Sequence, residues 1–339
     1  MKAVALNIAT VVMFTAGVGP ARSQDLRVGI IDFYRLRQVP ESQVRGALSI
    51  REDDTIDPKA IDEAKLRLAE LPGVERVRIG VVCCDNGRAI LYVGLEQKGS
   101  PVLRFRAAPR GRIRLPADVI QLEDEFSRAG LQAVLLGNAG EDHSKGHALM
   151  YDPDARAVQE QFINYAVSNV RLLRQVLRDS DDEQHRALAA QILGYAPDKR
   201  AVVDDLARAM DDPSESVRNN VMRALAVMAD FSSRSPELKI RIPARRFVNL
   251  LNSPVWSDLN KASMALAALS ETRDKGLLKA LREHAIESLV DMARFKSEGH
   301  AWAAFLLLGR VAGLPEDEIQ AAWTRGDRED VIRLALNRR

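Results

Sequence analysis

Apolar residues recur at helical spacing through the second half of the chain. The stretch from residue 212 to 228 shows this most clearly, with one apolar side made by Val217, Val221, Ala224, Leu225 and Met228. Asp212 and Pro213 are typical of a helix start, and Glu215 stands three residues after Asp212, as in a capping box. Such a helix cannot bury its apolar side alone, so the pattern predicts helices that pack against one another.

The apolar helices also repeat. Four leucines lie in similar small-residue contexts about 32 to 41 residues apart, the spacing of helix-pair repeats: Leu193, Leu225, Leu266 and Leu307. Polar turn signals separate the helices, for example Asp211-Asp212-Pro213 and Ser253-Pro254. Residues 156–339 are therefore predicted to form an all-α repeat array.

The region before the array has a different periodicity. Residues 26–37 and 74–84 read as strands, and residues 88–96 read as a third strand after the turn Asp85-Asn86-Gly87. Helical patterns over residues 41–48 and 58–71 lie between the first and second strands. The order β-α-α-β-β predicts a small α+β domain over residues 27–98, followed by a connector over residues 99–155.

The array resembles HEAT repeats. The resemblance is best from Val202 to Ala229, with Asp212-Pro213 before the second helix and Val217-Arg218 inside it, and Arg186 takes the place of Arg218 one repeat earlier. It implies a non-enzymatic scaffold that binds a protein or peptide on a concave surface lined by second helices. Candidate binding residues on that surface are Arg186, Asn219, Asn220, Arg223, Asn260, Lys261 and His300.

Residues 27–98 resemble a POTRA domain. The resemblance rests on the order of the elements and on Leu71-Pro72-Gly73-Val74-Glu75-Arg76-Val77, which leads from the second helix into the second strand. It implies an exported module that binds other polypeptides, often along an exposed strand edge. A small α/β domain that only caps the array is the competing interpretation.

Residues 1–23 have the pattern of a secretory signal peptide. Lys2 precedes an apolar run to Val18, and the small residues that follow offer cleavage sites after Ala21 or Ser23. The run is short and interrupted for a membrane span of about 20 apolar residues. We therefore expect an exported protein of the periplasm or the extracellular space, with no stable membrane span after cleavage and a bacterial envelope as the setting; an uncleaved anchor is the alternative.

The connector contains two segments with candidate chemistry. Residues 103–114 carry five arginines, as a solvated linker or an anion-contacting surface would. After a predicted helix over residues 116–136, the polar, glycine-rich stretch 137–147 carries the loop candidates Asp142, His143, Ser144 and His147. A polar loop docked on the array, a ligand-binding loop, and an enzyme or metal site are the three interpretations, the last also drawing on His300.

Composition narrows the function classes. The formal net charge of +2 gives no electrostatic reason to expect nucleic acid as a partner, and 5% aromatic residues favour helix packing over a β-sandwich. The two cysteines, Cys83 and Cys84, are adjacent and lack the spacing of a zinc or redox motif, so two small strand residues are expected. No cofactor, metal or catalytic residue is predicted.

Overall fold

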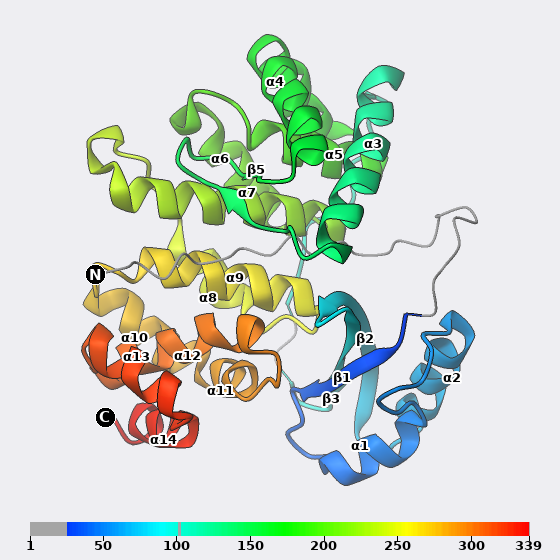
Figure 1. Cartoon of the computed structure of the whole chain (residues 1–339), viewed down its shortest axis with the longest axis vertical. Helices are drawn as coiled ribbons and strands as arrows, with labels where there is room; N and C mark the ends of the chain where they lie inside the picture. Colours follow the sequence, from blue (N-terminus) through cyan, green and yellow to red (C-terminus); the bar gives the residue numbers. More distant parts are fainter. Residues whose placement is uncertain (1–25, 101–102, 339) are drawn as a thin grey trace. The chain divides into compact units, whose positions relative to one another are not determined.

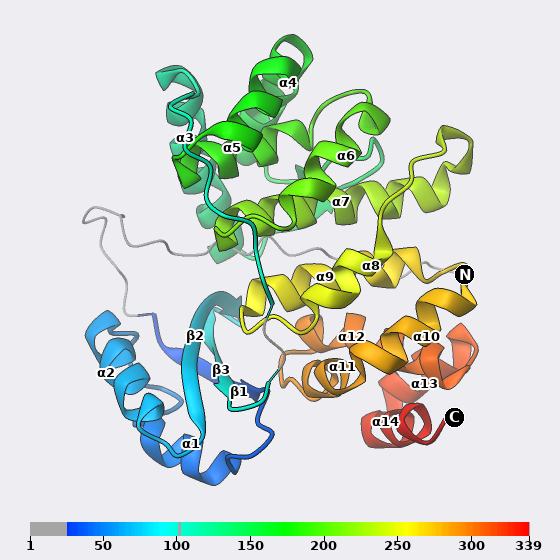
Figure 2. The ribbon, with the colours of Figure 1, turned by 180° about the vertical axis from the view of Figure 1, so that it is seen from behind.

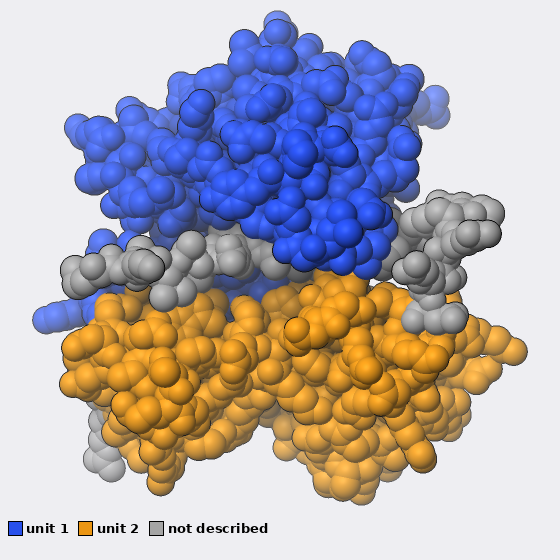
Figure 3. Space-filling model, in the orientation of Figure 1, with its two compact units in different colours: residues 1–10, 103–251, 257–284 blue, residues 11–102, 252–256, 285–339 orange. Residues whose placement is uncertain are grey.

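The computed structural model describes residues 26–100 and 103–338 and is mostly helical (Figure 1). The described residues form two compact units, coloured separately in Figure 3. Unit 1 holds residues 103–251 and 257–284, and unit 2 holds residues 26–100, 252–256 and 285–338. The signal peptide expected over residues 1–23 lies outside the described residues. Among those described, no helix is both long and apolar enough to cross a membrane.

Unit 2 begins with the predicted β-α-α-β-β order. Its elements are β1 (Val28–Tyr34), α1 (Glu41–Leu48), α2 (Pro58–Ala69), β2 (Val74–Asp85) and β3 (Arg88–Gln97). The sheet order is β1-β3-β2, with β1 parallel and β2 antiparallel to β3. Asn86 and Gly87 both have positive φ angles of 50° and 75°, as a two-residue hairpin turn requires, so the Asn-Gly turn predicted from the sequence is confirmed.

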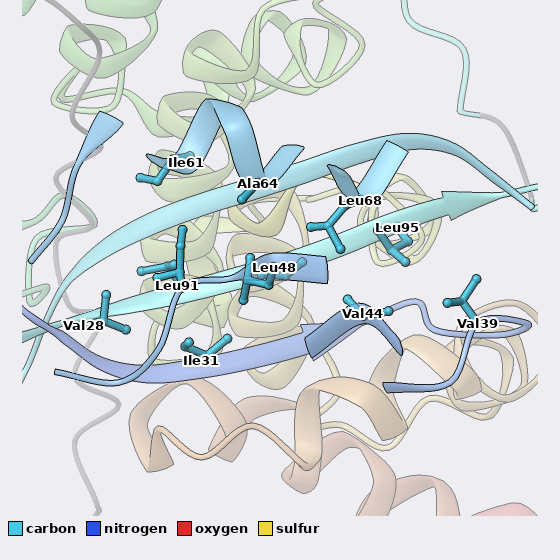
Figure 4. Packing of buried hydrophobic residues seen from close by; sticks show 12 residues of the cluster. Val28, Ile31, Val39, Val44, Leu48, Ile61, Ala64, Leu68, Leu91 and Leu95 are labelled. Carbon is cyan, nitrogen blue, oxygen red and sulfur yellow. The ribbon is translucent and has the colours of Figure 1, made fainter. Parts of the chain in front are cut away.

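One face of this sheet packs against α1 and α2. Leu91, Val93 and Leu95 alternate along β3 and meet Val44 and Leu48 of α1 and Ile61, Ala64 and Leu68 of α2 (Figure 4). The period of two on the strand and the period of three to four on the helices bring these apolar stripes together. Within residues 27–98, the sheet and the two helices therefore share one core, as predicted for a small α+β domain.

The other face of the sheet packs against C-terminal helices (Figures 1 and 2). The contacts with the sheet come from α11 (Ile286–Ala293) and α12 (Glu298–Ala312), while α13 (Glu316–Arg325) and α14 (Arg328–Asn337) pack against those two helices. The Tyr92 ring on β3 stacks on Trp256 at 4.6 Å and lies 4.9 Å from Phe295, while Asp32 on β1 accepts a hydrogen bond from the Lys296 backbone N–H. The helical residues 156–338 therefore divide between the two units, and α11 and α12 pack on the outer aromatic face of the sheet.

Unit 1 contains the remaining helices. They are α3 (Ala117–Leu135), α4 (Pro153–Asp179), α5 (Glu183–Leu193), α6 (Lys199–Ala209), α7 (Glu215–Arg234), α8 (Ala244–Leu250), α9 (Trp256–Leu269) after its first residue, and α10 (Lys275–His284). The leucines used to find the repeat, Leu193, Leu225, Leu266 and Leu307, are all fully buried. The sequence period therefore marks equivalent core positions of α5, α7, α9 and α12.

Buried ion pairs connect successive repeats of unit 1. Arg186 of α5 donates to both carboxylate oxygens of Asp212, at 2.9 and 3.0 Å, and Arg218 of α7 does the same to Asp258 of α9. Burial alone would raise the pKa of Asp212, but hydrogen bonds from Arg186 and Arg106 hold it below its usual value. Each pair joins a second helix to the start of the next one, so the arginines fix the spacing of the repeats.

The arginine-rich segment 103–114 runs along these turns and is not a solvated linker. Arg106 lies 2.5 Å from Asp212, the Phe105 ring lies under the Arg218 guanidinium at 3.9 Å, and Arg114 pairs with Asp181 at 2.6 Å. The Gly111 backbone N–H donates to the Asp179 carbonyl. Carboxylates at the repeat turns thus pair with two of the five arginines, Arg106 and Arg114, while Arg104, Arg110 and Arg112 are exposed.

Cys83 and Cys84 form a disulfide with each other near the end of β2. The ladder between β2 and β3 shifts register at this point, between the pairs Val82–Ile90 and Asp85–Arg88. Both cysteines lie in a strand, as expected from the sequence, and the extra residue of β2 forms a bulge that contains the linked pair.

Candidate functional site

A cluster of charged side chains forms where the loop after α3 meets α7. The loop is a short hairpin, with β4 (Glu141–Asp142) paired antiparallel to β5 (Leu149–Met150). Leu149 and Met150 are buried, and the Met150 backbone N–H donates to Gln159 of α4 at 2.7 Å. These contacts anchor the second strand, and the polar residues 141–147 extend from it toward α6 and α7 (Figure 1).

Glu141 is the centre of the cluster. Its side chain is nearly fully buried and forms an ion pair with Arg223 of α7. The His143 ring lies 3.3 Å from the second oxygen of Glu141 and 3.8 Å from Asp230 of α7. A buried carboxylate is stable only with such partners, so Arg223 holds the loop on α7.

A second contact lies at the other end of the loop. Lys199, at the start of α6, is buried and donates to the Gly194 carbonyl at 2.9 Å, and its Nζ lies 3.2 Å from Nδ1 of His147. Burial lowers the pKa of Lys199 to about 7. The pKa of His147 is lowered to about 4, first by burial and then by the charge of Lys199. His147 is therefore neutral at neutral pH and packs beside the Tyr195 ring.

Lys261 of α9 completes the cluster. It is 1% exposed, and its ammonium group has no hydrogen-bond partner within residues 26–100 and 103–338. Its pKa is lowered to about 7, mainly by burial and also by the charge of Arg223, against the opposing charge of Glu141. The charges of both members of the Arg223–Glu141 pair therefore act on Lys261, which brings a second buried cation to the cluster.

The loop candidates do not form a nucleophilic triad. The Asp142 carboxylate accepts the backbone N–H of Ser144 at 2.8 Å, which is the geometry of a turn, while Ser144 itself is exposed. The histidines contact Glu141, Asp230 and Lys199 instead. Among the described residues, no three His, Cys, Asp or Glu side chains gather as metal ligands would. The structure therefore gives the loop the role of a docked segment.

Three of the residues predicted to line the concave binding surface are buried in the structure. Arg186, Asn260 and Lys261 are buried, so they do not line a solvent-open groove as the sequence suggested. Asn220 donates to the Ala187 carbonyl at 3.0 Å and to Gln191 at 3.2 Å, which links α7 to α5. The sequence could not show this burial, because the partners of these groups lie in other repeats.

The remaining array candidates lie apart. Asn219 and Arg223 are half-buried residues one helical turn apart on α7, and Asn219 donates to Asn220 at 3.1 Å. His300 belongs to unit 2, where its Nδ1 lies 2.6 Å from the Tyr92 hydroxyl. The loop histidines belong to unit 1, so within its own unit His300 is part of the aromatic packing on β3.

Three residues of the cluster were missed from the sequence: Glu141, Lys199 and Asp230. Glu141 directly precedes the loop candidates, but a search for nucleophiles and metal ligands passes over a carboxylate whose role is to pair with a distant arginine. Asp230 follows the apolar run of α7 by two residues, and no local pattern marks it. Only the contact of the loop with α7 identifies them.

The chain was compared with known proteins. The family described as HEAT repeats matches residues 170–240, and no curated protein matches the chain. Among solved structures, a designed armadillo repeat protein is 16% identical, covering 54% of this chain and 92% of its own, with a TM-score of 0.36. An engineered protein is 18% identical, covering 65% and 96%, with a TM-score of 0.37.

A second designed armadillo repeat protein, in complex with the peptide (KR)4, is 14% identical, covering 65% and 98%, with a TM-score of 0.35. The HEAT match spans α5, α6 and α7 and includes Arg186 and Arg218, the two arginines of the buried pairs. The resemblance of residues 27–98 to a POTRA domain stays a prediction. The chain is a helical repeat protein with a small N-terminal sheet, and its residues 170–240 match HEAT repeats.

Proposed function

We propose that this protein is a non-enzymatic scaffold of the bacterial cell envelope that binds a protein or peptide partner. The surface used is the face of α7 that contains Asn219 and Arg223. One observation carries the proposal: this face already holds a polypeptide segment, residues 141–147 of the chain itself, through Arg223 and Asp230. A face that binds one segment through side-chain contacts has the chemistry to bind another.

The edge of β2 is the second surface of the proposal. In the sheet order β1-β3-β2, one side of β2 pairs with β3, and in the described part of the chain no strand pairs with its other side. An unpaired edge offers backbone N–H and C=O groups to an extended peptide. The POTRA-like interpretation of residues 27–98 leads to the same edge, and the observed β-α-α-β-β order supports it.

Site-specific photo-crosslinking in living cells tests the proposal. A photoreactive amino acid replaces Asn219 on α7 or Arg76 on β2, and the matched control replaces Arg208 of α6, whose side chain is 65% exposed. A discrete crosslinked species is expected at Asn219 or Arg76 and not at Arg208. Equal crosslinking at all three positions, or none at any, would count against a binding scaffold.

Export is tested on the same cells. If residues 1–21 or 1–23 form a cleaved leader, the mature protein begins at Arg22 or Gln24, and spheroplast formation releases it with the periplasmic fraction. Intact mass measurement of the purified protein identifies the first residue. Recovery of the full-length chain in the cytoplasmic fraction would remove the envelope from the proposal and leave the scaffold role to the crosslinking result.

A further inference from the structure

The charges around Glu141 are unequal. Arg223 and Lys261, from the successive second helices α7 and α9, both act on this one carboxylate. Lys261 is almost completely buried, and its ammonium group has no hydrogen-bond partner in the described chain. A buried cation without a hydrogen-bond partner is destabilising, so this site would gain from a carboxylate that reaches Lys261.

The segment that supplies Glu141 has few backbone contacts: besides its ladder, the Tyr151 N–H donates to the Gly140 carbonyl at 2.8 Å. Its ladder consists of two residue pairs, Glu141–Met150 and Asp142–Leu149. Gly137 and Gly146 flank it with φ angles of 75° and 72°, and the tip at Ser144 and Lys145 is exposed. Residues 148–150 are buried, so they can stay in place while residues 138–147 leave α7.

We propose that Arg223 and Lys261 form a carboxylate-binding site that Glu141 of the chain itself fills, and that an acidic peptide segment of a protein partner displaces residues 138–147 to reach it. The inference rests on the proposed scaffold function and names its partner class. A guanidinium matches the two oxygens of a carboxylate, and an incoming carboxylate that takes the place of Glu141 favours the protonated form of Lys261. Glu141 is then an internal competitor of the partner.

A peptide titration tests the site. Fluorescein-labelled oligo-glutamate is titrated with the mature protein and followed by fluorescence anisotropy, with oligo-glutamine as the uncharged control. Glu141→Gln removes the competitor's charge and should tighten binding about tenfold, whereas Arg223→Gln and Lys261→Met should each weaken it about tenfold, equivalent to about 1.4 kcal/mol. Lys261→Met keeps the test valid if Arg223→Gln fails to fold.

Lys279→Gln is the matched control, because Lys279 is a 69% exposed lysine of α10 in the same unit. It should bind oligo-glutamate as the wild type does. A loss in Lys279→Gln equal to that in Lys261→Met would show a general charge effect and overturn the site. Competition by inorganic phosphate as strong as that by free glutamate peptide would overturn the preference for a carboxylate.

Amide hydrogen exchange tests the displacement. Residues 138–147 should exchange faster in Glu141→Gln and in wild-type protein saturated with oligo-glutamate, while residues 148–150 keep their protection. Unchanged exchange over residues 138–147 would overturn displacement. If crosslinking at Asn219 persists in Arg223→Gln and Lys261→Met cells, the scaffold function stands and this inference fails, so the two failures are distinguishable.

Discussion

Arg218 and Asp258 are 40 residues apart in the chain and form an ion pair inside the helical array, with Arg218 Nη2 lying 2.8 Å from Asp258 Oδ2. The two side chains are 2% and 0% exposed. Arg218 also donates to the Asp212 carbonyl at 2.8 Å, and the Phe105 ring covers its guanidinium. One side chain therefore joins two repeat turns and the segment that runs along them.

Arg218→Ala should lower the free energy of unfolding by about 3–5 kcal/mol, because it removes the guanidinium that pairs with the buried Asp258 carboxylate. Urea denaturation followed by circular dichroism measures the loss. Arg208→Ala is the matched control: its i,i+3 pair with Asp205 is on the surface and contributes about 0–1 kcal/mol. Equal unfolding midpoints for the two variants would show that the buried pair does not fix the repeats.

Lys261→Met should stabilise the protein by about 1–3 kcal/mol at pH 7, because it removes a buried ammonium without a hydrogen-bond partner. The folded state holds the pKa of Lys261 near 7, against an ordinary value of 10.5. Between these values the unfolded chain binds more protons, so the contribution of Lys261 to wild-type stability rises with pH, by up to about 1.4 kcal/mol per pH unit.

The advantage of Lys261→Met should therefore shrink as pH rises from 7 toward 10.5. Urea titrations of both proteins at several pH values measure this difference in unfolding free energy. The contributions of Lys199 and the other titrating groups are the same in both proteins and cancel in the difference. A constant difference across this range would mean that Lys261 titrates normally and is accessible to water.

The secondary structure of this chain was predictable because its signals are local. The turn at Asn86-Gly87 and the periodic leucines each need only a few neighbouring residues to be recognised. The start of α7 was predicted two residues early, because Asp212 accepts the Ser214 N–H before the helix and Ser214 stands at the N-cap. Even the equivalence of Arg186 and Arg218 follows from position within a repeat, and the structure gives both the same role.

The contacts that decide function were not predictable, because they join distant residues. Lys261 follows Asn260 in a helix and resembles a surface lysine in the sequence, but α9 is buried along nearly its whole length. The Tyr92–His300 contact spans 208 residues and shows that α12 packs on the sheet. A sequence pattern predicts that polar side chains are exposed. That prediction was wrong for polar side chains that are buried between neighbouring helices.

A substitution at Gly94 tests the packing of Tyr34 on the face of the sheet opposite α1 and α2. A methyl group at this position would overlap the Tyr34 ring, whose hydroxyl donates to the Pro254 carbonyl at 2.7 Å. Gly94→Ala should therefore destabilise unit 2 by about 1–3 kcal/mol through overpacking. Thermal unfolding measures the change.

Gly46→Ala is its matched control. Gly46 lies inside α1 with open space around its Cα, so alanine there should stabilise the protein by about 0.5–1 kcal/mol. Both substitutions replace glycine by alanine, but they are expected to change the stability in opposite directions. A gain in stability in Gly94→Ala would show that Tyr34 does not pack against this strand.

Asp291 of α11 tests whether the last four helices belong to unit 2. Its carboxylate accepts the Arg35 backbone N–H at 2.8 Å and two hydrogen bonds from the Arg37 guanidinium, at 2.9 and 3.1 Å. Asp291→Ala should cost about 1–3 kcal/mol, because it removes the acceptor of a partly buried backbone N–H at the end of β1. It should also speed proteolysis within residues 285–338, since these helices would dock less firmly on the sheet.

Glu287→Ala removes one contact to the same Arg37 from a side chain that is 72% exposed, and it should change stability by less than about 1 kcal/mol. Limited proteolysis with mass spectrometry locates the cleavage sites in both variants. If α11 to α14 belonged instead to a continuous repeat array, Asp291→Ala would leave their protection unchanged. Cleavage confined to residues 285–338 in Asp291→Ala alone shows that the sheet, rather than a preceding repeat, holds the end of the chain.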